Sequence, residues 1–451
     1  MFVKRTAFVA GFSAVLLTVN LVSAQTYTVR GGAGLPFRAL EDTRNKLEVY
    51  LIYGSVGLGI EYTVPSDDGT AHQWFRYRQG VHNAEPVSST QTGATSTVLN
   101  PLPGYGYFVG LPSHPSTHYI YLIDYATVKP SLTSFTYASA SDPCGMLGFS
   151  VEGTVPKILY YIPSSLVPSE LKRSFTLSYQ TLEWSEEDKV FTRVNEDASF
   201  ADPFSLSIPA PLCDTEFRLS GDSFAEHFGL SQEFLSPVYA ATAVVAYADT
   251  VLLSPAAPPN QYSASQGLSA PVSLHFTGRA NDPVSFLYLW TIYREGEADK
   301  PIVRFTGKEI DYTFTTAGRY TATLGVSNRD GSCSDDSQQF TFEVSETYID
   351  IPNAFSPGAT PGVNDEFRIV YKSITNFKGY IFNRWGNKLF YWTDPAVGWD
   401  GRIKGRLAPS GTYFYVIEYR DSQGRPQKHT GPVHLMNSTT SSAPSSDTSK
   451  Q

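Results

Sequence analysis

In the stretch Tyr320-Thr321-Ala322-Thr323-Leu324-Gly325-Val326, every second residue is apolar or aromatic. The same alternation runs through Val272-Ser273-Leu274-His275-Phe276 and Phe340-Thr341-Phe342-Glu343-Val344. Successive side chains of a strand point to opposite faces, so this period places one face in a core and the other in water. Trp290 ends the apolar run Phe286-Leu287-Tyr288-Leu289-Trp290 and is suited to fill that core. These residues predict a β-sandwich over residues 251–346.

Short apolar runs separated by turn residues continue on the N-terminal side. Residues 25–127 contain runs such as Leu47–Tyr53 and Tyr119–Ile123. Residues 128–250 repeat this pattern, and Phe217–Leu235 is the stretch among them that suits a short helix. Regularly spaced short strands with Gly and Pro turns predict further sandwiches.

The composition favours the same fold class. Of 451 residues, 35 are Gly, 30 are Pro and three are Met, which is typical of turn-rich β structure rather than of helical bundles. The 14% aromatic content argues against a disordered chain. The net charge of −9 gives no basic surface for phosphate, so we expect no nucleic-acid partner.

The N-terminus has the order of a secretory signal peptide. Lys4 and Arg5 precede an apolar stretch over residues 7–19, and Val22-Ser23-Ala24 supplies small residues for cleavage after Ala24. A retained membrane anchor is the alternative, but the apolar run is shorter than the ~20 residues of a span. We therefore expect export, with residues 25–451 as the mature chain.

Export permits disulfides, and the chain has three cysteines. Cys144 and Cys213 lie in one segment, each near a proline, and form the candidate disulfide. Cys333 is then left with a free thiol or a partner elsewhere. Three cysteines without CxxC spacing argue against a zinc site.

The C-terminal residues read as a small antiparallel sandwich. Phe377–Phe382 and Lys388–Trp392 are expected strands joined by the turn Asn383-Arg384-Trp385-Gly386. The aromatic stretch Thr412–Tyr419 is the next expected strand, and Thr430–Met436 is the last.

Two resemblances follow from these residues. Residues 255–346 resemble a PKD domain, an immunoglobulin-like extracellular module, through Trp290, Phe314–Tyr320 and Leu324–Asn328. Residues 351–437 resemble the gliding motility-associated C-terminal domain of Bacteroidota, the type B sorting domain of the type IX secretion system. The sorting-domain motif residues are Asn353, Phe355, Pro357, Asn364, Asp365, Asn383, Arg384, Trp385, Gly386, Trp399, Asp400, Gly401, Gly411, Tyr413, Gly431 and Leu435.

The chain departs from that family in two places. Gly358-Ala359-Thr360-Pro361 replaces the family's Asn-Gly-Asp-Gly loop, so Asp365 and Glu366 alone would supply too few oxygen ligands and we expect no calcium there. The chain also continues past the last expected strand into residues 438–451, a Ser/Thr-rich tail that we expect to be disordered.

Catalytic patterns are weak. Gly221-Asp222-Ser223-Phe224 is similar to the nucleophile block of GDS-type esterases, but no alternating strand and helix pattern surrounds it, and Ser223 better suits a helix N-cap. The carboxylate run Glu183–Asp188 suits a solvated turn better than a glycosidase pair. We therefore expect no catalytic, cofactor-binding or metal-ligating residues, no cofactor and no enzyme.

The expected organisation is all-β: tandem immunoglobulin-like β-sandwich domains with a C-terminal β-sandwich sorting domain. Its divisions are the signal peptide and the tail, with sandwiches over 25–127, 128–250, 251–346 and 347–437. By resemblance, the protein is an exported cargo of the type IX secretion system, secreted or held at the outer membrane and cell surface.

The sandwiches are then modules for adhesion or surface assembly, with the secretion translocon and a host or cell-surface protein or glycan as expected partners. A structural adaptor of the secretion or cell-envelope machinery is the first alternative. An esterase or glycosidase is the second.

Overall fold

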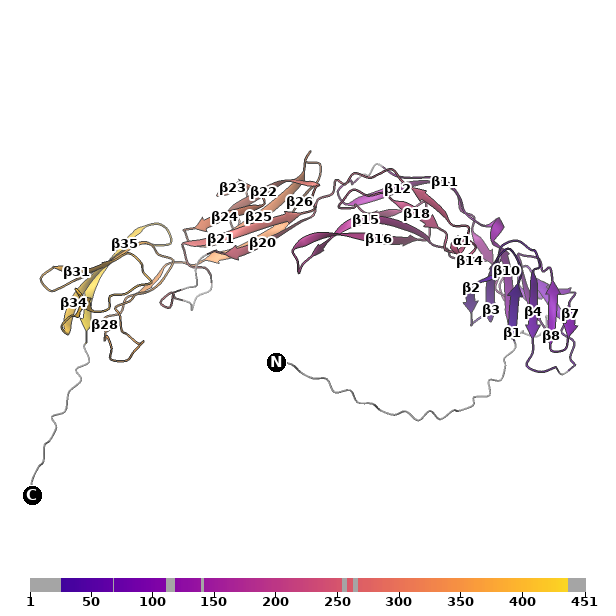
Figure 1. Cartoon of the computed structure of the whole chain (residues 1–451), viewed down its shortest axis with the longest axis horizontal. Coiled ribbons are helices and arrows are strands. Elements are labelled where there is room, and N and C mark those ends of the chain that lie inside the picture. The colour runs from indigo at the N-terminus through magenta and orange to yellow at the C-terminus, as the bar shows by residue number, and fades with distance from the viewer. Residues whose placement is uncertain are drawn as a thin grey trace, which may run out of the picture.

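The computed structural model describes residues 26–67, 69–110, 118–138, 142–253, 258–262 and 267–436. The predicted signal peptide and the predicted tail lie outside these residues. Figure 1 shows strand-built modules that follow one another in chain order along an elongated, curved molecule. The described residues form 35 strands, two short 3-10 helices and one five-residue α-helix. The all-β prediction is confirmed.

The first module packs two sheets against each other. One sheet has the order β1 (Thr26–Arg30), β4 (Gly59–Thr63), β8 (Thr95–Leu99), β7 (Thr90–Thr92). The other has the order β2 (Phe37–Asp42), β3 (Leu47–Ile52), β10 (Tyr119–Asp124), β9 (Tyr105–Val109), β5 (Trp74–Tyr77), β6 (Glu85–Val87). Ile60 of one sheet and Trp74 and Ile120 of the other share a buried cluster. The 3-10 helices η1 (Val81–Asn83) and η2 (Tyr125–Thr127) complete the module.

The second module holds three sheets. Their orders are β11 (Ser131–Tyr137), β12 (Met146–Thr154), β17 (Ser207–Pro209); β13 (Ile158–Tyr160), β14 (Ser169–Leu171); and β16 (Val190–Phe200), β15 (Phe175–Ser185), β18 (Arg218–Gly221), β19 (Gln232–Leu235). Helix α1 (Ser223–His227) lies inside the stretch expected to hold one. Ile158 and Phe224 join a buried cluster with Val49 and Phe108 of the first module, so the two modules share a core.

The third module is the sandwich predicted around Trp290. Its sheets have the orders β20 (Ala246–Leu252), β21 (Val272–Ala280), β24 (Glu309–Phe314) and β23 (Val303–Thr306), β22 (Ser285–Arg294), β25 (Gly318–Asn328), β26 (Ser334–Val344). Every second residue of β21 is buried, as its alternation predicts. Trp290 is fully buried, with its ring 5.4 Å from that of Phe276.

The fourth module is built on a five-stranded sheet. The order of this sheet is β28 (Ala354–Phe355), β35 (Pro426–Leu435), β34 (Gly411–Arg420), β30 (Thr375–Phe382), β31 (Lys388–Trp392). Short pairs accompany it: β27 (Tyr348–Asp350) with β29 (Val370–Lys372), and β32 (Arg402–Ile403) with β33 (Arg406–Leu407).

The disulfide corrects the candidate pairing of Cys144 with Cys213. Cys144 is bonded to Cys333, across the joint between the second and third modules. Cys213 is a free, buried cysteine, and burial raises the pKa of its thiol. Proximity in sequence was misleading because the start of β12 meets the turn before β26, which brings the two Cα atoms to 5.5 Å.

Candidate functional site

The inner face of the five-stranded sheet holds the core of the fourth module. Phe377 and Ile381 of β30 are buried on it, as are Tyr413 and Ile417 of β34, with an even spacing of four residues that keeps each pair on one face. The core therefore forms on one face of the sheet, and the residues between these are left on the other face.

Four motif residues belong to this core: Phe355, Tyr413, Leu435 and Trp399. The ring of Trp399 is fully buried and lies 5.4 Å from the ring of Phe355 and 5.1 Å from that of Tyr413. Its indole N–H donates to the carbonyl of Arg402 at 3.0 Å, which satisfies the polar atom inside the core. These residues are required for the fold whatever the domain binds.

Another group forms turns and close contacts. The side-chain oxygen of Asn383 accepts hydrogen bonds from the amides of Trp385 (3.1 Å) and Asn387 (2.9 Å), and Gly386 has a φ of 80°. The β30–β31 turn therefore has the Asn and Gly geometry predicted from its sequence.

Gly401 and Gly431 are needed where chain segments approach closely. A Cβ atom on Gly401, whose φ is 75°, would lie 3.0 Å from both Leu435 and Pro357. A Cβ atom on Gly431 would lie 2.7 Å from the hydroxyl of Tyr415. A larger residue at either position would push the last strand away from the core.

Asp365 closes the loop that departs from the family pattern. Its carboxylate oxygens accept hydrogen bonds from the amides of Gly358 (2.8 Å) and Gly362 (2.6 Å), and these bonds lower the pKa of the carboxyl group. Asn364 beside it is left-handed, with a φ of 55°. Both oxygens of Asp365 are thus used in holding the loop.

Three further motif residues support the chain through local contacts. The carbonyl of Asn353 accepts from the amide of His434 at 2.8 Å. The Asp400 carboxylate accepts from the amide of Arg402 at 2.9 Å, and Gly411 is the first residue of β34.

Arg384 and Trp385 differ from the rest of the motif. Trp385 is 70% exposed on the β30–β31 turn, and the Arg384 guanidinium lies 4.3 Å from the centre of its ring. Neither side chain belongs to the core cluster of the module. Trp385 is therefore available to contact other molecules.

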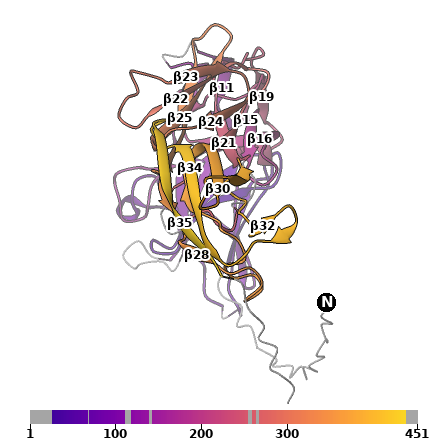
Figure 2. The ribbon, with the colours of Figure 1, turned by 90° about the vertical axis from the view of Figure 1, so that its left-hand side faces the viewer.

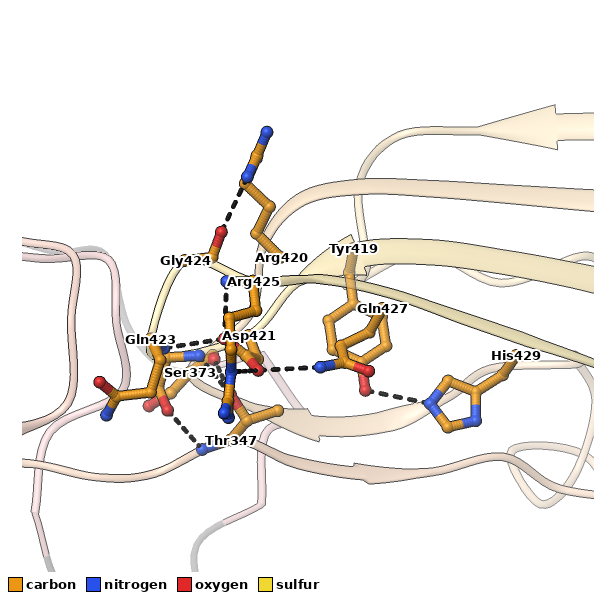
Figure 3. Close-up of polar contacts among 11 residues, drawn as sticks. Thr347, Ser373, Tyr419, Arg420, Asp421, Gln423, Gly424, Arg425, Gln427 and His429 are labelled. Atoms are coloured by element: carbon orange, nitrogen blue, oxygen red, sulfur yellow. Dashed lines mark hydrogen bonds and ion pairs between the residues drawn. The ribbon is translucent and has the colours of Figure 1, made fainter.

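The β34–β35 turn joins the fourth module to the third. Figure 3 shows the hydrogen bonds that hold this turn. Asp421 accepts four hydrogen bonds of 2.9 Å, from the amides of Gln423 and Arg425 and the side chains of Arg425 and Gln427. Burial of Asp421 acts to raise the pKa of its carboxyl group, but these bonds outweigh it and lower the pKa to about 2. These four bonds fix the conformation of the turn.

Ser422, the next residue of this turn, makes the contact between the third and fourth modules. The carbonyl of Ser422 accepts from the amide of Ala317 in the third module at 2.8 Å. The amide of Ser422 donates to the hydroxyl of Thr347 at 2.6 Å, and that hydroxyl donates to the carbonyl of Ser373 at 2.7 Å. The β34–β35 turn, Thr347 and the loop that follows β29 are thus bonded together.

A second contact lies beside the first. The side-chain amide of Asn260 donates to the carbonyls of Ile369 (2.8 Å) and Pro395 (2.7 Å). The ring of Tyr262 is stacked on that of Tyr348, 4.0 Å between centres. The sequence interpretation missed all these joint residues. The one available signal was an Asp placed before the turn Ser422-Gln423-Gly424.

The esterase-like string has a structural role. Asp222, rather than Ser223, is the N-cap of α1, accepting from the amide of Ala225 at 3.0 Å, so the expectation for Ser223 is corrected. The exposed hydroxyl of Ser223 lies 3.4 Å from the amide of Ser174, and the Nε2 atom of His227 lies 2.9 Å from the carbonyl oxygen of Leu35. No serine, histidine and carboxylate relay is formed here.

The described part of the chain holds no group of three or more His, Cys, Asp or Glu side chains able to bind a metal ion. Among the same residues, no helix has the length and apolar content for crossing a bilayer.

Comparison with protein families assigns three of the modules. Residues 136–236 match the fibronectin type III domain, residues 260–339 the PKD domain and residues 349–435 the CHU_C type IX secretion signal domain. The chain carries a type IX secretion signal domain. The recognition of a sorting domain preceded by a PKD domain is confirmed, and the modules found are of types that are typically non-enzymatic.

No curated protein matches the chain. Among solved structures, a tetra-tandem repeat from the extending region of a large adhesion protein is 11% identical, with 92% of this chain and 100% of that chain covered and a TM-score of 0.23. Dimeric latent PorU from Porphyromonas gingivalis is 13% identical, with 73% and 35% covered and a TM-score of 0.15. The BSP domain of a biofilm associated protein is 10% identical, with 97% and 100% covered and a TM-score of 0.15. Such scores are too low to indicate function.

Proposed function

We propose that this protein is a cargo of the type IX secretion system, carried to the cell surface or released there, where its upstream sandwiches serve adhesion or surface assembly. The observation that carries the proposal is the secretion signal domain over residues 349–435. The upstream fibronectin type III and PKD modules support it because such sandwiches are common in extracellular proteins. Their ligand would be a host or cell-surface protein or a glycan.

The last strand offers a physical means of recognition. β35 pairs with β34 along its whole length, but β28 pairs only with His434 and Leu435 on the other side. Pro426–Val433 therefore present an edge without a strand partner among the described residues. An extended segment of the translocon would add to such an edge through main-chain hydrogen bonds.

The test compares the full chain with a chain lacking residues 351–451. Intact cells are treated with protease, and the released peptides are identified by mass spectrometry. We expect peptides of the upstream modules from the full chain, and retention of the truncated chain inside the cell. A chain lacking only residues 437–451 is the matched control and should still be exposed.

Unchanged surface exposure after removal of residues 351–451 would refute the sorting role. Thermal unfolding of the truncated chain shows whether its upstream modules still fold, so that degradation is not mistaken for failed export. Recovery of translocon subunits in stoichiometric amounts with the purified protein would instead favour the adaptor alternative.

A further inference from the structure

Part of the outer face of the five-stranded sheet is apolar, where an antiparallel sheet usually presents polar side chains to water. Its strands β34, β30 and β35 stand at the front of the molecule in Figure 2. The side chains on this face alternate with the buried ones described above. These side chains are not part of the core cluster of the module.

Strand register places these apolar side chains in two adjacent rows. In one row Tyr391 is paired with Tyr380, and Tyr380 with Val416. In the next row Phe382 is paired with Phe414, and Phe414 with Pro432. We call this set the aromatic face; its members are Tyr380, Phe382, Tyr391, Phe414, Val416 and Pro432.

The aromatic face is open to solvent and continuous. Phe414 is 43% exposed and Tyr391 is 47% exposed. The ring centre of Tyr380 lies 5.0 Å from that of Tyr391 and 6.3 Å from that of Phe382. Exposed apolar patches of this kind mark interaction sites on soluble proteins.

The exposed Arg384–Trp385 pair extends this face at the β30–β31 turn. Phe382 and Lys388 are paired with each other on either side of that turn, so the turn directly adjoins the second row. Trp, Tyr and Arg are the residues most enriched in the energetic centres of protein interfaces. Their combination is typical of a surface that binds a protein partner.

Basic side chains border the aromatic face in two places. The Nζ atom of Lys388 lies 5.8 Å from the ring centres of both Tyr380 and Tyr391. Lys378 and Lys428 flank Glu418 across the neighbouring row, where Lys428 and Glu418 form an ion pair at 3.0 Å. Lys378 and Lys388 give this side of the sheet a net positive charge. The complement of this surface is therefore acidic at its rim.

The charge is particular to this module. Residues 351–436 contain eleven Lys and Arg against six Asp and Glu, whereas residues 26–350 contain twenty against thirty-six. A basic module on an acidic chain is the expected pattern when that module meets a negatively charged partner.

From these observations we infer that the aromatic face is the surface by which the domain docks on a protein of the export machinery, a partner with an apolar centre and a rim of carboxylates. This inference rests on the proposed function and adds to it the face and the chemistry of the partner. Apolar contact with the rings supplies affinity, and the lysines steer the encounter.

The test uses full-length variants in cells. Phe414→Glu and Trp385→Glu place carboxylates on the face, and the matched control is Phe204→Glu in the second module, where the phenylalanine is also 43% exposed. We expect surface exposure to fall about tenfold or more for each face variant, the size expected for an interface hot spot, and to stay unchanged for Phe204→Glu. Thermal unfolding should be equal in all variants.

A charge series gives an independent readout. Reversal of Lys378, Lys388 and Lys428 to Glu should lower export, and their replacement by Arg should preserve it, because Arg retains the charge. A photo-crosslinking amino acid at position 385 should capture a subunit of the export machinery in living cells, and Phe414→Glu should abolish that crosslink.

Several outcomes would overturn the inference. Normal export of the face variants, together with loss of export after removal of residues 351–451, would reject the docking face and leave the proposed function standing. Failure of that deletion to change export would reject the proposed function itself. Two other outcomes, each with normal export of the face variants, would assign the face to another occupant. Salt-sensitive self-association of the purified chain that the face variants lose would assign it to a second copy. Binding to phosphatidylglycerol vesicles that the face variants lose would assign it to lipid.

Discussion

Asp222 shows how a single buried carboxylate joins two modules. Its side chain is fully buried, with the Arg173 guanidinium at 2.8 Å and the Tyr125 hydroxyl at 2.5 Å. Tyr125 lies at the end of the first module, and Arg173 lies in the second. Through Nη2, Arg173 also donates to the carbonyls of Val128 and Pro156. A buried charge is tolerated only when it is paired and hydrogen-bonded in this way.

Removal of that carboxylate should be strongly destabilising. Asp222→Ala leaves Arg173 buried without its partner, and we expect the free energy of unfolding to fall by about 3–5 kcal/mol. Urea unfolding of the purified chain measures the change. Ser223→Ala, at the exposed neighbouring position, is the control and should change stability by less than about 0.5 kcal/mol. Equal effects of the two variants would disprove the role given to Asp222.

Asp421 should make the β34–β35 turn sensitive to acid. Its pKa is about 2 in the folded state, against an ordinary value of 3.8, so the folded state favours the carboxylate. The stabilisation is therefore present above about pH 4 and is lost as pH falls toward 2. As pH falls between these values, the unfolding temperature should drop less for Asp421→Asn than for the parent chain. An equal drop in the two chains would contradict the role given to Asp421.

At the scale of elements, the β15–β16 hairpin reaches from the second module to the third. The ring of Trp184 is stacked on that of Tyr247 at 4.3 Å. The carbonyl of Lys189, at the hairpin tip, accepts from the Arg279 side chain at 2.9 Å. Together with the disulfide of Cys144, the hairpin holds this joint at two places far apart in sequence.

The disulfide assignment can be checked by peptide mapping. Unfolded but unreduced protein should show one free thiol, at Cys213, and one crosslinked peptide pair containing Cys144 and Cys333. Cys144→Ser or Cys333→Ser should destabilise the joint by up to about 5 kcal/mol on the chain-entropy account. Cys213→Ala serves as the control and should leave the crosslinked pair intact. A peptide linking Cys144 to Cys213 would restore the pairing expected from sequence.

At the scale of the molecule, contacts between neighbouring modules are present at all three joints. The first joint has a shared core and the Asp222 network, the second the disulfide and the hairpin, and the third the Ser422 and Asn260 contacts. Figure 1 shows the resulting curved rod. A rod of this kind holds its C-terminal module at one end, away from the first.

The third joint should therefore resist proteases until its hydrogen bonds are removed. Thr347→Val keeps the shape of the side chain but leaves the Ser422 amide and the Ser373 carbonyl without their partner, a cost of about 1–3 kcal/mol for a buried group. We expect faster cleavage within residues 345–350, detected by mass spectrometry. Thr341→Val, on an exposed position of β26, should be cleaved at the parent rate. No difference between them would mean that the joint is held elsewhere.

The amino-acid sequence by itself determined the fold class and the identity of two modules. Alternation in β21 and β25 predicts strands with one buried face, because the period of side-chain direction is a local property of the backbone. The turn around Asn383 is likewise local, since the Asn side chain bonds amides two and four residues away. The signal peptide, the module boundaries and the sorting role of the motif residues stay predictions.

Only the tertiary structure decided how the modules are joined and which side chains remain exposed. Cys144 meets Cys333 across 189 residues, and Asp222 meets Tyr125 across 97. No local pattern encodes such a pairing, because it depends on the angle between packed sandwiches. The aromatic face was hidden for the same reason. Phe414 and Tyr413 are adjacent and both aromatic, and only the packing of β34 shows which of them is buried.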